Sequence, residues 1–253
     1  MSDWRTAAGI ARSCLIYWRP GRQAALTRWY RPMVPPGSLA FDIGAHLGDR
    51  SIAFARLGAR VVAVEPQPAL LPVLRRITAP VPAITVLPLA VGARPGTARL
   101  SVSRATPTVS SLSGDWVHAM QSRHPGFRRV RWDGEATVSV TTLDQLIAEH
   151  GVPAFCKIDV EGLEADVLVG LGQPLQAVSF EFIPGAIEVA LACVQRLGQL
   201  AHYRYNVAIA EQRRFQLPAP VDAATLSAWL TAAGSGSRSG DVYAFRSDPP
   251  PGP

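Results

Sequence analysis

A carboxylate followed by two glycines marks the segment of this sequence best suited to chemistry. An apolar segment ends at Asp42, the chain then turns through Gly44 and Gly48, and a helical pattern begins. Glycines let a ligand rest on the backbone of such a turn, and the free N–H groups of the helix then face that ligand. Glu65 ends the next apolar segment about 20 residues later, where a carboxylate accepts hydrogen bonds from two ribose hydroxyls. The spacing predicts a site for a nucleotide-type cofactor.

The glycine spacing and the charge of the turn distinguish two cofactors. Dinucleotide sites use G-x-G-x-x-G to seat a pyrophosphate, but here His46 takes the place of the second glycine and the spacing is G-x-x-x-G. Asp42 would repel a phosphate and attract an ammonium or sulfonium group. We therefore expect S-adenosyl-L-methionine, bound by Asp42, Gly44, His46, Gly48 and Glu65. The alternatives are a nicotinamide dinucleotide and a purely structural turn.

Asp159 and Glu181 also stand at or near the ends of apolar segments. The strand ends of an open parallel sheet meet at its ligand-binding edge. Asp159 is therefore the first candidate proton acceptor, Glu181 the second and His118 the third, although either carboxylate could instead cap the following helix. Lys157, the only lysine of the chain, lies two residues before Asp159 and is expected beside the cofactor. No metal site is predicted, because the cysteines and histidines lack metal-ligating spacing.

The elements that must position these residues alternate along the chain. Strands are expected at 39–42, 61–65, 84–89, 97–103, 136–140, 154–160, 177–182, 203–209 and 241–246. Helical segments separate most of them, which is the pattern of an α/β domain with a parallel sheet. We expect an N-terminal helical cap at 1–36, the main domain at 37–247 with a loop excursion at 104–135, and a disordered tail at 248–253.

Charge and composition narrow the classes of protein. The 253 residues carry a formal net charge of +6 without a Lys-rich run or a recognisable nucleic-acid module, so a solvated basic surface is favoured over a nucleic-acid footprint. Three scattered cysteines favour a reducing compartment. No apolar stretch approaches the roughly 18 residues that a membrane span requires. We expect a soluble, cytoplasmic protein.

Several segments together resemble a known family. The chain resembles the FkbM family of S-adenosylmethionine-dependent methyltransferases at Phe41–Gly48, Val64–Pro66, Leu89–Gly92, Thr142–Asp144 and, most specifically, Lys157–Glu164. The resemblance implies a class I methyltransferase fold, in which a Rossmann-like, mostly parallel sheet has an antiparallel last strand and helices on both faces. We accordingly add Pro66, Ala90 and Lys157 to the cofactor site. At position 46 the family usually has asparagine, so His46 departs from its pattern.

The resemblance also implies O-methylation, often of sugar hydroxyls in secondary metabolites or surface glycans. We expect the acceptor to be a hydroxyl of a small molecule or glycan, free or linked to a carrier. The basic N-terminal helices leave a nucleic-acid methyltransferase and a non-catalytic binding module as alternatives. A nicotinamide-dependent oxidoreductase is the alternative from another class of enzyme. The sequence assigns neither the acceptor nor an oligomeric state.

Overall fold

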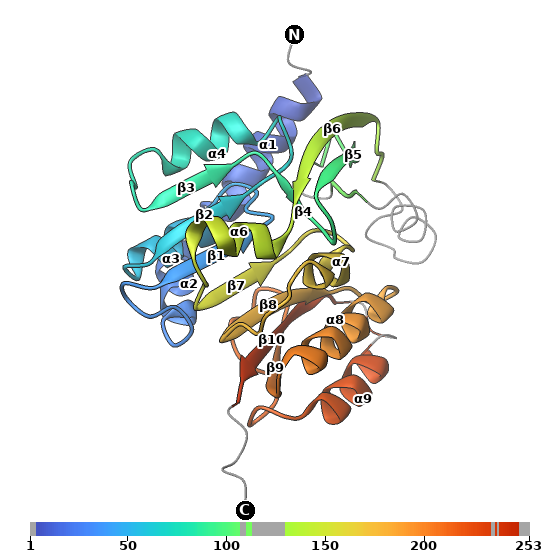
Figure 1. Ribbon diagram of the computed structural model, residues 1–253. Helices are drawn as coiled ribbons and strands as arrows, with labels where there is room; N and C mark the ends of the chain where they lie inside the picture. The colour runs from blue at the N-terminus through green and yellow to red at the C-terminus, as the bar shows by residue number, and fades with distance from the viewer. Residues whose placement is uncertain (1–3, 107–109, 113–129, 234–235, 237, 248–253) are drawn as a thin grey trace, which may run out of the picture.

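A seven-stranded sheet forms the centre of the protein, whose structure is a computed structural model describing residues 4–106, 110–112, 130–233, 236 and 238–247. Its strands are β1 (Leu39–Ile43), β2 (Arg60–Val64), β3 (Ile84–Leu87), β7 (Phe155–Ile158), β8 (Ala177–Phe182), β9 (Tyr203–Ile209) and β10 (Gly240–Arg246). Their order is β3-β2-β1-β7-β8-β10-β9 (Figure 1). β10 runs antiparallel to β8 and β9, and the other pairs are parallel. The predicted α/β class, with an antiparallel last strand, is confirmed.

Helices cover both faces of this sheet (Figure 1). They are α1 (Trp4–Tyr17), α2 (Arg22–Tyr30), α3 (Asp49–Arg56), α4 (Leu71–Thr78), α6 (Leu143–His150), α7 (Glu164–Val169), α8 (Ile187–Leu200) and α9 (Ala223–Ala233). Successive strand residues point to opposite faces. Phe41 of β1 therefore joins a core with α6, α7, α8 and α9, while the adjacent Ala40 joins a second core with α2 and α3. Because Tyr30 of α2 is 1% exposed, the end of the expected cap is an integral part of the second core.

A small second sheet lies beside the carboxyl ends of β1 and β2. It consists of β4 (Ala90–Val91), β6 (Gly134–Thr141) and β5 (Gly96–Val102), in the order β4-β6-β5. β5 and β6 form the expected antiparallel pair. The expected strand 84–89 was too long, because β3 ends at Leu87 and Ala90–Val91 pairs with β6 instead. Pairing with β6 therefore holds Ala90 and Val91 in the second sheet.

The sequence analysis missed helix α9. The signals for it are an N-terminal Asp222, whose Oδ1 accepts a hydrogen bond of 2.8 Å from Thr225 N, and buried Leu226 and Leu230 one helical turn apart. The bulk of the loop excursion and the tail 248–253 lie outside the described residues.

Candidate functional site

A cavity of about 320 Å³ lies at the carboxyl ends of β1, β2, β7 and β8. Its apolar part is lined by Leu70, Leu89, Leu100 and Leu112. Its acidic part is lined by Asp159, Glu161, Glu181 and Asp241. Flat aromatic groups suit the first part and cations suit the second.

Most of the sequence-predicted site residues surround this cavity. Those that line it are Gly44, His46, Glu65, Pro66, Ala90, Asp159 and Glu181. Three others lie behind the cavity wall, namely Asp42, Gly48 and Lys157. His118 falls outside the described residues. The structure thus separates residues that can touch a ligand from residues that act on the site through neighbours.

Two backbone N–H groups hold the side chain of Glu65 in the cavity wall. Its Oε2 accepts a hydrogen bond of 2.8 Å from His46 N, and its Oε1 accepts one of 2.8 Å from Gln67 N. Burial raises the pKa of Glu65 to about 7, although these two N–H groups lower it. A carboxylate has about four lone-pair positions. Glu65 can therefore still accept two hydroxyl hydrogens from a ligand.

The two glycines of the turn are required by close packing. A Cβ on Gly44, which has a φ of +83°, would lie 1.9 Å from the backbone oxygen of Asp159. A Cβ on Gly48, which has a φ of +74°, would lie 2.7 Å from Leu74 Cδ1. Gly44 thus lets β1 approach the loop after β7, and Gly48 lets α3 approach α4. This reason differs from the ligand contact expected from the sequence.

His46 forms part of the cavity wall as a neutral side chain. Its φ of +50° lies in the left-handed region, and its ring meets the Tyr17 ring edge-on with centroids 5.0 Å apart. Burial lowers the pKa of His46 to about 4, outweighing the raising effect of Asp49 and Asp159. Its Nε2 is buried without a hydrogen-bond partner. A ligand in the cavity can supply that partner.

Lys157 and Asp42 support the site from behind. They are register partners on β7 and β1, and each is 1% exposed. Lys157 Nζ donates a hydrogen bond of 2.6 Å to Asp159 Oδ2, and Ser51 Oγ donates one of 2.5 Å to Asp42 Oδ2. The Lys157 charge therefore reaches the cavity through Asp159. This compact ammonium lies between two carboxylates, as suits the only lysine of the chain.

The carboxylates of the acidic part differ in proton affinity. Burial favours protonation of Asp159, but Lys157 and Arg50 outweigh it and hold the Asp159 pKa below its ordinary value. Burial and the neighbouring Asp159 raise the pKa values of Glu161 and Glu181 well above the ordinary value of a glutamate. Glu181 Oε2 is buried and has no hydrogen-bond partner. Titratable groups with divergent pKa values in one pocket are typical of acid–base sites.

Glu161 is a site residue that the sequence analysis missed. Asp159, Glu161 and Glu181 each place one carboxylate oxygen within 4.8 Å of the others, close enough to surround one cation or share one proton. Glu161 has a φ of +54°. The next loop is fixed by buried Glu164, which accepts hydrogen bonds from Val160 N and Gly162 N. The signal available for Glu161 was its place between Asp159 and Glu164.

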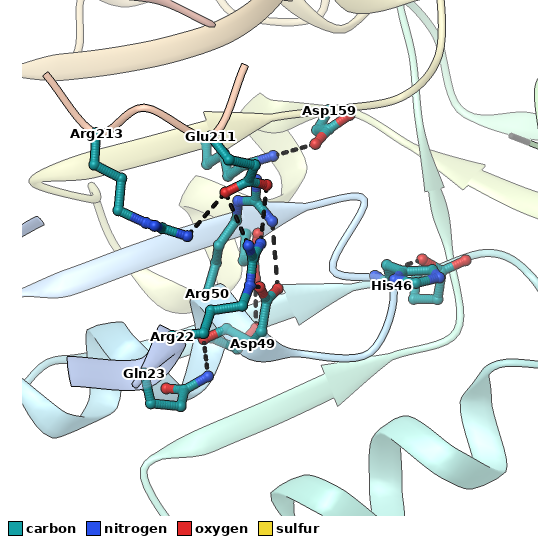
Figure 2. A network of polar contacts seen from close by, with 12 residues as sticks. Arg22, Gln23, His46, Asp49, Arg50, Asp159, Glu211 and Arg213 are labelled. Atoms are coloured by element: carbon teal, nitrogen blue, oxygen red, sulfur yellow. Dashed lines mark hydrogen bonds and ion pairs between the residues drawn. The ribbon is translucent and has the colours of Figure 1, made fainter. Parts of the chain in front are cut away.

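An ion-pair network joins three distant segments at one wall of the cavity (Figure 2). Arg22 of α2 donates to Asp49 Oδ2 at 2.8 Å and to both carboxylate oxygens of Glu211 at 2.9 Å. Arg50 lies 3.3 Å from Asp49 and 3.4 Å from Glu211. Although burial favours protonation, these arginines lower the pKa of Glu211 to about 2. The network, which we call the Arg22 clamp, connects α2 to the start of α3 and to the segment after β9.

Several other residues that line the cavity could not be predicted from the sequence. They are Tyr17, Arg50, Gln67, Glu211 and Asp241. Asp241 pairs in register with Glu181, because β10 lies next to β8. Burial raises the pKa of Asp241 to about 6. The sequence placed Asp241 at the start of a strand but gave no strand order.

The strand order and the cavity at the carboxyl edge define the class I methyltransferase fold. A family model described as the methyltransferase FkbM domain matches residues 42–212. The chain therefore belongs to the FkbM methyltransferase family, which confirms the resemblance seen in the sequence. Membership in a methyltransferase family favours a methyltransferase over a nicotinamide-dependent oxidoreductase.

Solved methyltransferases share parts of this fold at low sequence identity. One is the precorrin-6y C5,15-methyltransferase of Geobacter metallireducens, at 12% identity and a TM-score of 0.46, covering 89% of this chain and 88% of that one. Another is a SAM-dependent O-methyltransferase of Thermotoga maritima, at 9% identity and a TM-score of 0.41, covering 92% and 67%. A comparison with curated protein sequences finds no match. The class of protein rests on the strand order and on the family match.

The cavity meets the requirements of the methyl donor that this family implies. Three buried acceptor atoms of residues that line it lack a hydrogen-bond partner within the described part of the chain: His46 Nε2, Gln67 Oε1 and Glu181 Oε2. Buried polar atoms are normally satisfied, and S-adenosylmethionine carries ribose hydroxyls, an amino group and an ammonium that can donate to them. Its sulfonium charge is compatible with the acidic part of the cavity. The residues present therefore fit this cofactor.

Proposed function

We propose that the protein transfers the methyl group of S-adenosylmethionine to a hydroxyl of a small molecule or glycan. The observation that supports this proposal is one cavity with two different carboxylate environments. Glu65, fixed by two backbone N–H groups, suits the cofactor ribose. Asp159 and Glu181 suit the positive charge of the donor and the proton of the acceptor hydroxyl.

Asp159 and Glu181 have separate roles in this proposal. When bound, the cofactor supplies an electrophilic methyl group, so that much of the rate comes from alignment of the acceptor oxygen. Asp159 stays ionised beside Lys157 and balances the positive charge of the bound donor. Glu181 in its ionised form takes the proton, since its raised pKa gives it the greater proton affinity. The sequence analysis had ranked Asp159 first as the base.

The class of acceptor can be tested with a labelled methyl group. The protein is incubated with labelled S-adenosylmethionine and cell extracts, and the extracts are then fractionated by size and treated with ribonuclease or glycosidase. We expect label in the small-molecule or glycan fraction, and less label with the Glu65→Gln variant when S-adenosylmethionine is not saturating. Label in large, ribonuclease-sensitive material would replace the proposed acceptor by RNA, the alternative acceptor.

Glu65→Gln should weaken the binding of S-adenosylmethionine by about 1 to 3 kcal/mol, roughly 5- to 150-fold. The amide would set an N–H donor against the backbone donors of His46 or Gln67. Because the pKa of Glu65 is raised to about 7, the wild-type carboxylate gains a proton as the pH falls, and affinity should drop between about pH 8 and pH 6. Calorimetry across that range measures both effects.

Glu149→Gln is the matched control for this experiment, because the Glu149 side chain is 71% exposed and does not line the cavity. It should bind like the wild type at each pH. If Glu65→Gln keeps wild-type affinity and the same pH dependence, Glu65 does not hold the ribose.

A further inference from the structure

Helix α1 exposes its large apolar residues and buries its small ones. Its buried residues are Gly9 and Ser13, whereas Trp4 is 73% and Leu15 is 78% exposed. At 100° per residue, one line along the helix carries Trp4, Ala8, Ala11 and Leu15, and all four are exposed. We call this line the α1 stripe. A surface helix normally turns its apolar face inward, so packing against the described residues does not account for the α1 stripe.

Positive charge lies along one flank of the α1 stripe. Residues 4–31 contain six arginines and no aspartate or glutamate. Arg22 is buried in the Arg22 clamp, and the other five arginines are exposed. Arg5 and Arg12 lie two helical turns apart on one flank of the stripe. Arg12 also donates a hydrogen bond of 3.1 Å to Ala105 O, which holds α1 beside the end of β5.

We propose that α1 docks the protein on the surface of an anionic phospholipid bilayer. Helices that lie in a membrane interface combine an apolar face with flanking arginines, and their affinity depends on both. Here Trp4 and Leu15 enter the boundary of the acyl chains, and the arginines meet the lipid phosphates. No helix in the described part of the chain is long and apolar enough to cross a membrane. With 14 residues, α1 is too short to span a bilayer, and in this proposal it lies along the surface.

Two other occupants fit the α1 stripe less well. A second copy of the chain would bring arginines against arginines, because residues 4–31 offer no carboxylate to pair with them. RNA would meet the arginines, but the aliphatic Leu15 and the two alanines of the stripe offer no surface for base stacking. An anionic bilayer can contact both, because its phosphates pair with the arginines and its acyl chains contact the apolar residues of the stripe.

The position of α1 relates this surface to the cavity. Tyr17, the last residue of α1, lines the cavity and touches His46. A helix seated on a bilayer would therefore bring the cavity wall close to the lipid headgroups. The membrane inference does not depend on the proposed methyl acceptor, since docking is measured without cofactor or acceptor.

The test is co-sedimentation with vesicles of phosphatidylcholine alone and of phosphatidylcholine with phosphatidylglycerol. We expect binding to the anionic vesicles, little binding to the neutral ones, and weakening by added salt. Leu15→Glu should lower the affinity for anionic vesicles by about tenfold or more, because a carboxylate would enter the acyl boundary. Val152→Glu is the matched control, since Val152 is 55% exposed but lies outside α1, and it should bind like the wild type.

Each contrary result overturns the proposal. These results are no binding to either vesicle, equal binding to both, or equal losses in Leu15→Glu and Val152→Glu. A molar mass in solution that falls from dimer to monomer in Leu15→Glu would assign the stripe to a second copy. RNA binding that survives Leu15→Glu, together with absent vesicle binding, would assign the basic segment to nucleic acid. Methyl transfer remains measurable in every case.

Discussion

Asp159→Asn should lower turnover by at least about a hundredfold while the protein stays folded. Asn keeps an oxygen that can accept the hydrogen bond from Lys157, which now lies 2.6 Å from the carboxylate. It removes the negative charge that balances the sulfonium. The measurements are kcat, KM and the melting temperature. Asp166→Asn, on the exposed side of the adjacent α7, is the control and should leave kcat unchanged.

Two outcomes would contradict this role of Asp159. The first is near-normal turnover, and the second is a fall in melting temperature that accounts for the whole loss of activity. A parallel Glu181→Gln variant separates the two carboxylates. If Glu181 takes the proton, its loss lowers kcat with little change in KM and removes the acid limb of the pH–rate profile. An unchanged acid limb would return the proton-acceptor role to Asp159 or His118.

Gly44→Ala should destabilise the protein by about 3 kcal/mol or more. Two costs combine, because the residue has a φ of +83° and its new Cβ would meet the backbone oxygen of Asp159 at 1.9 Å. Gly37→Ala separates them. Gly37 has a φ of +77° and nothing within 4 Å of a Cβ, so this variant should lose only about 1 to 2 kcal/mol. Urea unfolding measures both free energies.

Equal losses in the two glycine variants would contradict the packing argument, because the clash would then contribute nothing. A larger loss in Gly44→Ala would show that the turn is fixed by the approach of β1 to the loop after β7. That loop carries Asp159 and Glu161. We therefore expect any surviving folded Gly44→Ala protein also to bind S-adenosylmethionine more weakly than Gly37→Ala does.

Local patterns predicted the strands well where apolar runs had clear ends. β8 and β9 have the bounds expected from the sequence, since 177–182 and 203–209 are continuous apolar or alternating runs. Glu65 and Asp159 were found for the same reason, because a carboxylate directly after a buried strand is unusual. α9 was missed because its apolar residues stand between two strands and are followed directly by a Gly/Ser-rich segment at 235–240, which is typical of a loop. β4 was missed because two residues are too few for a pattern.

The rest of the site depends on contacts between distant segments. Asp241 meets Glu181 only because β10 inserts between β8 and β9. Arg22 meets Glu211 across 189 positions of the sequence. The pKa differences arise from burial and from these neighbours, so they follow only from the folded arrangement. No local pattern encodes such pairs.

The Arg22 clamp bears on how this enzyme can be recombined with its relatives. The family match at 42–212 excludes both α2 and β10. A chimera joined at those boundaries would leave Asp49, whose side chain is 3% exposed, without Arg22 and with only the longer Arg50 contact of 3.3 Å, and would remove Asp241 from the cavity. Buried charges that lose their partner cost about 3 to 5 kcal/mol. An exchange of acceptor specificity must therefore carry the N-terminal helices and the last strand as matched parts.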